Sequence, residues 1–279
     1  MKDIKIGFIG QGMVGKHFAD NFESCGYEVV RYSKEEPYIA NEAKIKDCDV
    51  VFIAVPTSTT LEGYDASILR AVIPLVGKGK IAILKSTIYP GLTKKLQEEN
   101  PDVILIHSPE FLSEATVAYD TSHPFANIVG IPKDTDTYKK AAELVHTLLP
   151  KAPFSTTVSS EEAELIKYAH NCGGYTQIIF FNLIYDLSQA LEANWGKIEE
   201  AMQADPFVPN RYARPIHKSG RGAGGRCFPK DFEALLRSYK DKVKDEKGLK
   251  VLESIRDKNI ELLKESRKDA EILKEVYNI

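Results

Sequence analysis

The chain has 279 residues, of which 43% are hydrophobic and 28% charged, a composition typical of a globular protein with room for two domains. Lysine and arginine total 37 against 40 aspartate and glutamate residues, so the net charge of -3 offers no general attraction for nucleic acid or an anionic membrane. No apolar stretch approaches the roughly 20 residues of a membrane-spanning helix. The four cysteines are widely spaced without a metal-ligand pair, which favours a reduced cytoplasmic protein without a metal site.

A glycine-rich turn follows the first predicted strand, at residues 4–9. Beyond the turn, Val14, Phe18 and Phe22 recur at helical spacing. The turn itself, Gly10-Gln11-Gly12-Met13-Val14-Gly15, has the G-x-G-x-x-G pattern. Between a strand and a helix this pattern brings backbone N–H groups to a pyrophosphate. The sequence therefore predicts a dinucleotide-binding Rossmann domain that contacts its cofactor through these six residues.

The residue expected to contact the adenosine ribose is unusual. A second predicted strand, residues 28–32, ends at Ser33, where NAD-binding folds usually carry an acid. Arg31 and Lys34 flank it and suit the 2′-phosphate of NADP, whereas Glu35 or Glu36 would be an alternative ribose ligand. We interpret Ser33 and Lys34 as cofactor contacts, and at this stage both NAD and NADP remain open.

Polar loops follow the next three predicted strands, at residues 50–55, 80–84 and 103–107. The carboxyl ends of strands line the ligand site of an open α/β sheet. The loop residues of interest are Val55, Pro56, Thr57, Ser86, Thr87, Glu110 and Glu114. The two glutamates are four residues apart, a spacing that places both carboxylates on one face of a short helical turn.

A sixth strand at residues 127–131 and a helix at 134–149 complete a doubly wound parallel sheet, and residues 151–153 are predicted as a linker. From Ser160 a long helix is expected to run to about residue 191, with Lys167 and Asn171 on one face. A surface lysine and a solvated asparagine would show the same spacing. The predicted fold is α/β, with a Rossmann domain at 1–153 and an all-helical domain with a long central helix at 154–279.

A cysteine stands at the predicted start of a later helix. Gly222, Gly224 and Gly225 precede Cys227, and the apolar spacing from Phe232 onward is helical. A helix N-terminus favours the thiolate, and the glycines would let a flat or bulky ligand approach the main chain. A glycine turn followed by an inert cysteine is the alternative. Arg211, in the preceding proline-rich loop, is the best candidate there for a phosphate or sugar contact.

The cysteine stretch, the helix segment 164–171 and the loops at 55–57, 86–87 and 108–115 resemble the motifs of the UDP-glucose/GDP-mannose dehydrogenase family, over roughly residues 1–240. The resemblance implies oxidation of a nucleotide-sugar primary alcohol, such as that of UDP-glucose, to the carboxylate with NAD. It also implies that Cys227 forms a thiohemiacetal and then a thioester, as in enzymes of polysaccharide biosynthesis. Family members normally end in a third α/β domain that grips the nucleotide, whereas the roughly 50 residues after Cys227 are predicted as helices.

The same resemblance assigns roles to individual residues. Glu110 would help water to cleave the thioester, and Glu114 would reach the cofactor. Thr87, Lys167, Asn171 and Asp231 would position that water and stabilise oxyanions. The predicted substrate contacts are Glu110, Phe111, Leu112, Lys167, Asn171, Arg211, Gly222, Gly224 and Gly225.

Two other functions remain open on the sequence. One is a two-electron dehydrogenase acting on a small hydroxy acid, and the other is a binding homologue without catalysis. The apolar residues between Tyr175 and Leu187, including Ile179, predict a homodimer built on the long helix. A monomer whose C-terminal helices cover the same surface is the alternative.

Overall fold

The computed structural model describes residues 4–208, 210–218 and 220–279, and these form two compact units. We call Met1–Ser58 with Asp65–Lys167 the sheet unit, and Thr59–Tyr64 with Tyr168–Ile279 the helical unit. The predicted division at residue 153 lies earlier in the chain than this one.

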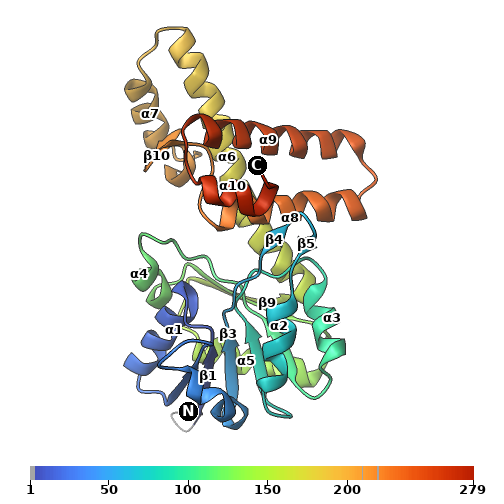
Figure 1. Ribbon diagram of the computed structural model, residues 1–279. Coiled ribbons are helices and arrows are strands. Elements are labelled where there is room, and N and C mark those ends of the chain that lie inside the picture. Colours follow the sequence, from blue (N-terminus) through green and yellow to red (C-terminus); the bar gives the residue numbers. More distant parts are fainter. Residues whose placement is uncertain (1–3, 209, 219) are drawn as a thin grey trace. The chain divides into compact units, whose positions relative to one another are not determined.

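The sheet unit contains a seven-stranded sheet with the order β2-β1-β3-β6-β7-β8-β9 (Figure 1). The strands are β1 (Ile6–Ile9), β2 (Val29–Tyr32), β3 (Val50–Ile53), β6 (Ile81–Leu84), β7 (Ile104–His107), β8 (Ala126–Ile131) and β9 (Phe154–Ser159). Pairing is parallel from β2 to β7, as predicted for a doubly wound fold.

The last two strands depart from the prediction. β8 pairs antiparallel with β7, because the connection between them carries only the short helix α4 (Val117–Ser122) rather than a full crossover helix. β9 pairs parallel with β8 and directly follows the predicted linker. Its sequence lacks an apolar alternation because it is an edge strand whose residues are exposed or half-buried.

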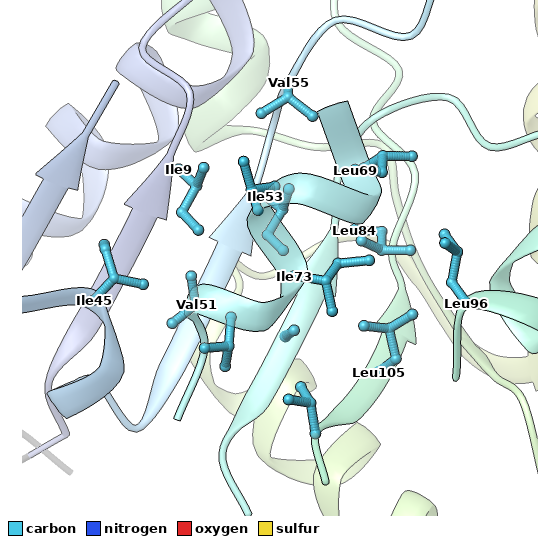
Figure 2. Close-up of a cluster of buried hydrophobic side chains, with 14 of the residues drawn as sticks. Ile9, Ile45, Val51, Ile53, Val55, Leu69, Ile73, Leu84, Leu96 and Leu105 are labelled. Carbon is cyan, nitrogen blue, oxygen red and sulfur yellow. The ribbon is translucent and has the colours of Figure 1, made fainter. Parts of the chain in front are cut away.

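Helices pack on the sheet through two apolar clusters. The remaining elements of this unit are α1 (Met13–Ser24), η1 (Ile39–Asp47), α2 (Ser67–Val72), η2 (Ile73–Leu75), α3 (Leu92–Glu99) and α5 (Asp136–Leu148). Along β3, Val51 and Ile53 enter the cluster shared with α2 and α3, whereas Phe52 enters the cluster shared with α1 and α5. Figure 2 shows the first cluster. This period-two alternation fixes the register, because a one-residue slip would move every side chain of the strand into the opposite cluster, where its shape does not match.

The long helix α6 (Ser160–Ala190) connects the two units in sequence (Figure 1). It begins with a capping box: Ser159 Oγ accepts the N–H of Glu162, and Glu162 Oε2 accepts the N–H of Ser159. The predicted bounds of the helix are therefore confirmed within a residue. At Gly174 a Cβ atom would lie 2.7 Å from the ring of Tyr212, so the close approach of that ring explains this glycine.

The helical unit is not all-helical. Its elements are β4 (Thr59–Thr60), β5 (Gly63–Tyr64), α7 (Trp195–Ala204), η3 (Asn210–Tyr212), β10 (Ile216–His217), β11 (Gly220–Arg221), α8 (Cys227–Lys242), α9 (Glu246–Glu265) and α10 (Ala270–Tyr277). The hairpins β4-β5 and β10-β11 were not predicted, because two-residue strands leave no periodic signal. In the core of the unit, Tyr175 of α6 stacks on Phe232 of α8 with ring centroids 4.1 Å apart. Among the described residues, no helix is long and apolar enough to cross a membrane.

Candidate functional site

The glycine turn between β1 and α1 has the geometry of an anion cradle. Gly10 has φ +90°, and a Cβ there would lie 2.3 Å from the carbonyl oxygen of Ala54. A Cβ on Gly15 would lie 1.9 Å from the oxygen of Gly10, so both positions require glycine. Gly12, the residue before α1, faces open space instead. The turn therefore leaves the N-terminus of α1 open to a pyrophosphate.

Near the expected adenosine ribose, the surroundings of Arg31 do not favour binding of the NADP 2′-phosphate. The guanidinium of Arg31 is committed within the unit, because Nη2 contacts the carboxylates of Asp20 at 2.6 Å and Glu23 at 2.7 Å. Its side chain is only 9% exposed. Lys34 is exposed, and Ser33 Oγ donates to the carbonyl of Glu35. These contacts argue against the hypothesis that Arg31 and Lys34 together hold a 2′-phosphate, which stays a prediction.

Two of the predicted cofactor loops are tied to each other. Ser86 Oγ donates to the carbonyl of Val55 at 2.7 Å, and Thr57 Oγ1 donates to the carbonyl of Thr87 at 3.0 Å. Ser86, Thr87 and Thr57 are buried, whereas Pro56 is exposed. The loops after β3 and β6 thus form one braced edge of the sheet.

A residue outside the predicted site, Glu164, also fixes the segment that follows Thr87. Glu164 is fully buried, and its carboxylate accepts the backbone N–H of Gly91 at 2.5 Å and of Thr93 at 2.9 Å. It therefore caps the start of α3 from α6. Burial raises the pKa of Glu164 to about 7, although the two N–H groups favour its ionised form. The only hint in the sequence was its position, because Glu164 is the first residue of the helix segment 164–171 that resembles the family motif.

Lys167 and Glu110 form a buried ion pair. Lys167 Nζ donates to Glu110 Oε1 at 3.0 Å and to the backbone carbonyl of Glu110 at 2.6 Å, with side-chain exposures of 5% and 10%. Burial alone would raise the pKa of Glu110, but Lys167, the N–H of Leu112 and Lys85 outweigh it and lower the pKa. The lysine also lies 5.5 Å from the ring centroid of Phe111. The ionised carboxylate is thereby maintained away from bulk water.

Lys85 and His107 complete this cluster and were not predicted. Lys85 Nζ donates to Ser108 Oγ at 3.2 Å, in the segment that leads to Glu110. Burial lowers the pKa of Lys85 to about 7, and Lys167 lowers it further, against the opposing effect of Glu110. Burial likewise lowers the pKa of His107 to about 3, so its ring is neutral and Nδ1 donates to the carbonyl of Leu84.

Glu110 and Glu114 do not share a helical face. Residues 108–113 form an extended loop and residues 114–116 a turn, so the i to i+4 geometry of a helix does not apply. Glu110 is buried, whereas Glu114 is exposed. Pro109 and the bond from Leu112 N–H to Glu110 Oε2 hold the loop in this form.

In the helical unit, Asn171 meets Asp231. Asn171 Nδ2 donates to Asp231 Oδ2 at 2.7 Å, which joins α6 to α8. Asp231 is 1% exposed, and its other oxygen accepts from Lys230 Nζ at 2.6 Å. Four residues before Asp231, the exposed Cys227 is the first residue of α8, so the predicted placement at a helix N-terminus is confirmed.

Two of the glycines before Cys227 are explained by packing within the helical unit and not by the approach of a ligand, which the sequence had predicted. Gly222 and Gly224 lie against side chains of the helical unit: a Cβ at Gly222 would lie 3.0 Å from Asn259 Oδ1, and one at Gly224 would lie 1.9 Å from Asp269 Oδ2. Only Gly225, with φ +76°, faces open space among these three. Arg211 is exposed in η3 and stands 5.9 Å from the ring of Tyr212.

Two family models match the chain. The NAD binding domain of the UDP-glucose/GDP-mannose dehydrogenase family matches residues 33–149, and the central domain of the same family matches residues 161–261. Together they span most of the sequence. The chain belongs to the UDP-glucose/GDP-mannose dehydrogenase family. The family expectation and the NAD expectation are thereby confirmed, although the glycine turn lies before the matched segment.

Relatives with curated names point the same way. The chain is 28% identical over 277 residues to the putative UDP-glucose 6-dehydrogenase YtcA of Bacillus subtilis, covering 94% of this chain and 62% of that protein. It is 31% identical over 206 residues to a UDP-glucose 6-dehydrogenase of Streptococcus pneumoniae, covering 70% of this chain and 51% of that protein. The chain thus spans about three fifths or less of the length of these relatives.

Solved structures show the same fold. A UDP-glucose dehydrogenase from Pyrobaculum islandicum superimposes with a TM-score of 0.78 at 23% identity, over 95% of this chain and 71% of that one. The 3-hydroxyisobutyrate dehydrogenase of Mycobacterium tuberculosis superimposes with a TM-score of 0.72 at 15% identity, over 96% and 95%. At these identities the superpositions speak for the fold alone.

In the sheet unit, the residues of the glycine turn fit the pyrophosphate of the cofactor. The open Gly12 position and the absence of an acid in the first turn of α1 leave the N–H groups of that turn available to an anion. The braced Val55–Thr57 and Ser86–Thr87 loops stand at the carboxyl ends of β3 and β6, on the side where such sheets bind nucleotides.

Proposed function

We propose that the protein oxidises the primary alcohol of a nucleotide sugar, of the UDP-glucose type, to the carboxylate with two equivalents of NAD. The observation that carries this proposal is the pair of contacts made by one helix: Lys167 of α6 is paired with the acid Glu110, and Asn171, four residues later, is bonded to the acid Asp231. Because the chain spans about three fifths of its relatives, their activity enters here as a proposal.

The reaction balances in four steps. The alcohol loses a hydride and a proton to give an aldehyde, and the Cys227 thiol adds to its carbonyl carbon to form a thiohemiacetal. Loss of a second hydride and proton gives a thioester. Water then cleaves the carbon–sulfur bond, which yields the carboxylate and restores the thiol. NAD, when bound, accepts the two hydrides. Three protons are released in total.

Each residue has a role that its surroundings support. Cys227 is exposed at the start of α8, where the helix dipole favours the attacking thiolate. Glu110 is kept ionised by Lys167 and accepts a proton from the attacking water. Lys167 and Asn171 donate to oxygens that gain negative charge, which is worth roughly 3 to 4 kcal/mol per donor. Asp231 orients the Asn171 amide, and Thr87 lies in the braced loop after β6.

Glu114, Phe111, Leu112, Arg211 and Gly225 are proposed contacts of cofactor or substrate. Gly225 and Arg211 are supported by the open space and exposure at their positions. Gly222 and Gly224 contribute through the packing that their missing side chains allow. A cytoplasmic location and a role in polysaccharide biosynthesis stay predictions.

A two-electron dehydrogenase acting on a small hydroxy acid is the second candidate. A 3-hydroxyisobutyrate dehydrogenase shares this fold over 95% of its own chain, so the fold does not separate the two candidates. The two candidates differ in stoichiometry and in their need for a thiol. The four-electron oxidation reduces two NAD per sugar, whereas the hydroxy-acid reaction reduces one and needs no cysteine.

The test uses the purified full chain, NAD and a panel of UDP-, GDP- and TDP-sugars. We expect two NADH and one carboxylate per sugar consumed. Cys227→Ser should abolish acid formation while NAD affinity, measured by calorimetry, stays within about twofold. Cys25→Ser is the matched control, since Cys25 is also exposed but lies at the end of α1. Full activity of Cys227→Ser would refute the thioester route.

We also propose a homodimer built on the later part of α6. In the helical unit, Phe180, Leu183, Leu187 and Leu191 are 47–69% exposed and recur every three or four residues. They form one apolar stripe without a charged member, which a second copy of the same helix would cover by symmetry. Ile179, in contrast, is 2% exposed and packs inside the unit, so it does not belong to the predicted interface.

Sedimentation at micromolar concentration tests the dimer. Leu187→Asp should give a monomer, because it places a charge within the stripe, whereas the neighbouring exposed Gln189→Asp should leave the dimer intact. A wild-type protein that is monomeric at every concentration would remove the proposal.

A further inference from the structure

The turn between α9 and α10 grips the main chain that leads to the cysteine. We call Ser266–Asp269 the C-terminal turn and Gly220–Gly225 the glycine stretch; both belong to the helical unit. The glycine stretch ends two residues before Cys227. The C-terminal turn lies beyond residue 261, where the match to the family's central domain ends.

Side chains replace the hydrogen bonds that a neighbouring strand would otherwise make. Asn259 of α9 is fully buried, its Oδ1 accepts the N–H of Ala223 at 2.7 Å, and its Nδ2 donates to the carbonyl of the same residue at 3.0 Å. Ser266 Oγ accepts the N–H of Arg221 at 3.1 Å. Both bonding groups of Ala223 are thereby satisfied away from water.

The two charged residues of the C-terminal turn complete the grip. Lys268 is 7% exposed, and its Nζ donates to the carbonyl of Gly222 at 2.9 Å and reaches that of Gly220 at 3.5 Å. Asp269 Oδ2 accepts the N–H of Gly225 at 2.8 Å. Bonds to charged groups are the stronger kind, so the lysine and the aspartate hold the stretch more firmly than neutral groups would.

Glycines stand where the glycine stretch approaches the C-terminal turn most closely. At Gly220 a Cβ would lie 2.7 Å from Ser266 Cβ, and at Gly224 it would lie 1.9 Å from Asp269 Oδ2. Three of the glycines thus face the turn and Asn259, and a side chain at any of them would push the two segments apart.

The turn itself adopts a backbone conformation that costs energy. Arg267 has φ +55° and Asp269 has φ +52°, in the left-handed region that residues other than glycine seldom adopt. Such conformations cost on the order of 1 kcal/mol or more each, and they cluster at sites where geometry serves function. Here they allow the side chains of Lys268 and Asp269 to reach successive parts of the glycine stretch.

We propose that Lys268 and Asp269 are positioning residues for Cys227: they fix the glycine stretch so that the thiol is presented at the first turn of α8. This inference rests on the proposed function for its catalytic consequence, but the grip on the main chain can be tested without any substrate. The two residues bond to the backbone of Gly222 and Gly225, and their effect on the thiol passes through these bonds.

The first experiment measures hydrogen exchange of the full chain. We expect amides of residues 220–228 to exchange about tenfold faster in Asp269→Ala and in Lys268→Met, because the bonds that close the stretch are lost. Asp269→Asn should restore most of the wild-type protection, since its side-chain oxygen still accepts from Gly225 and asparagine tolerates positive φ. Exposed neighbours provide the matched controls Lys264→Met and Glu271→Ala.

Peptides from the sheet unit report whether a variant is simply unfolded. Faster exchange in both units would identify general destabilisation, and the Asp269→Asn comparison then decides, because it changes the charge but keeps the bond. Exchange of residues 220–228 within twofold of wild type in both Asp269→Ala and Lys268→Met would overturn the proposal.

The second experiment examines the thiol. Iodoacetamide should alkylate Cys227 at least about threefold more slowly in Asp269→Ala, relative to the exposed Cys25 of the same molecules, because Cys227 spends less time in the first helical turn. An unchanged ratio of the two alkylation rates would refute the positioning role even if exchange increases.

The third experiment is kinetic and applies once a sugar substrate is known. We expect kcat of Asp269→Ala to fall by about tenfold or more while the KM for NAD stays within twofold, because the segment that matches the NAD-binding domain belongs to the other unit, apart from Thr59–Tyr64. An unchanged kcat would refute the catalytic consequence. If the wild type oxidises no nucleotide sugar, the proposed function fails, and exchange and alkylation still decide the grip on the cysteine.

Discussion

The two units hold their candidate catalytic groups by different means. In the sheet unit, Glu110 is fixed by the charges of Lys167 and Lys85, all three largely removed from water. In the helical unit, the glycine stretch before Cys227 is held at its backbone N–H and carbonyl groups, by the neutral Asn259 and by the charged Lys268 and Asp269. Loss of one partner from the buried ion pair leaves a charge without compensation, whereas loss of one side chain from the helical unit leaves the other backbone bonds of the glycine stretch in place.

The largest effect should follow from removing one charge of the sheet-unit cluster. In Lys167→Met the carboxylate of Glu110 stays buried without its main partner, so we expect unfolding free energy to fall by roughly 3 to 5 kcal/mol. We also expect kcat to fall by about 10²- to 10³-fold from the loss of a donor to the developing oxyanion. Urea unfolding and NADH production measure the two quantities.

The matched control is Lys94→Met. Lys94 pairs with Glu161 at 3.4 Å, but both partners are well exposed, so its loss should cost less than about 1 kcal/mol. Equal costs for the two variants would contradict the claim that burial makes the Lys167 pair different.

Removal of the Asn171 amide in the helical unit should lower the unfolding free energy by less than removal of Lys167. In Asn171→Ala, Asp231 loses one bond but keeps Lys230, so we expect a loss of about 1 to 3 kcal/mol. Activity should still fall by about 10²-fold, since Asn171 is a proposed donor. Gln189→Ala, at an exposed position of the same helix, serves as control. A stability loss larger than that of Lys167→Met would reverse the comparison.

Periodicity and local motifs in the sequence predict those features that depend on short-range patterns. The parallel strands, the start of α6 at its Ser159 cap and Cys227 at the start of α8 all follow from short-range patterns. The strand β9 was not predicted, because a polar edge strand has no apolar alternation. The contacts of Asn259 and Asp269 were not predicted either. These residues lie 36 and 44 residues from their backbone partners, so no local pattern connects them to the glycine stretch.

Two buried groups of the sheet unit should give opposing pH effects. Burial lowers the pKa of His107 to about 3, from 6.5, so the stability it contributes is complete above pH 6.5 and is lost as the pH falls toward 3. Burial raises the pKa of Glu164 to about 7, from 4.5, so its contribution is complete below pH 4.5 and is lost as the pH rises through 7. Burial lowers the pKa of Lys85 to about 7, from 10.5, so the titration of Lys85 affects stability mainly above pH 7.

Single variants should separate the two effects between pH 5 and 6.5. In His107→Asn only Glu164 remains, and unfolding free energy should fall by about 1.4 kcal/mol per pH unit as the pH rises. In Glu164→Gln only His107 remains, and the slope should have the opposite sign and similar size. The wild type should be nearly flat. Urea unfolding at four pH values measures all three, and equal slopes in both variants would show that neither group titrates as its burial implies.

The smallest effect concerns the choice between NAD and NADP. Arg31 would discriminate in favour of NADP only if its guanidinium faced the ribose, and a lost bidentate phosphate contact would then weaken NADP selectively by about tenfold or more. The structure instead pairs it with Asp20 and Glu23 of α1, so Arg31→Met should change the ratio of the two affinities by less than about twofold. Lys46→Met is the matched control, because Lys46 is an exposed cation of the same unit outside the predicted cofactor contacts. Calorimetric titration of both cofactors decides the matter: a selective loss of NADP binding in Arg31→Met would show that the arginine leaves its carboxylate partners when the cofactor binds.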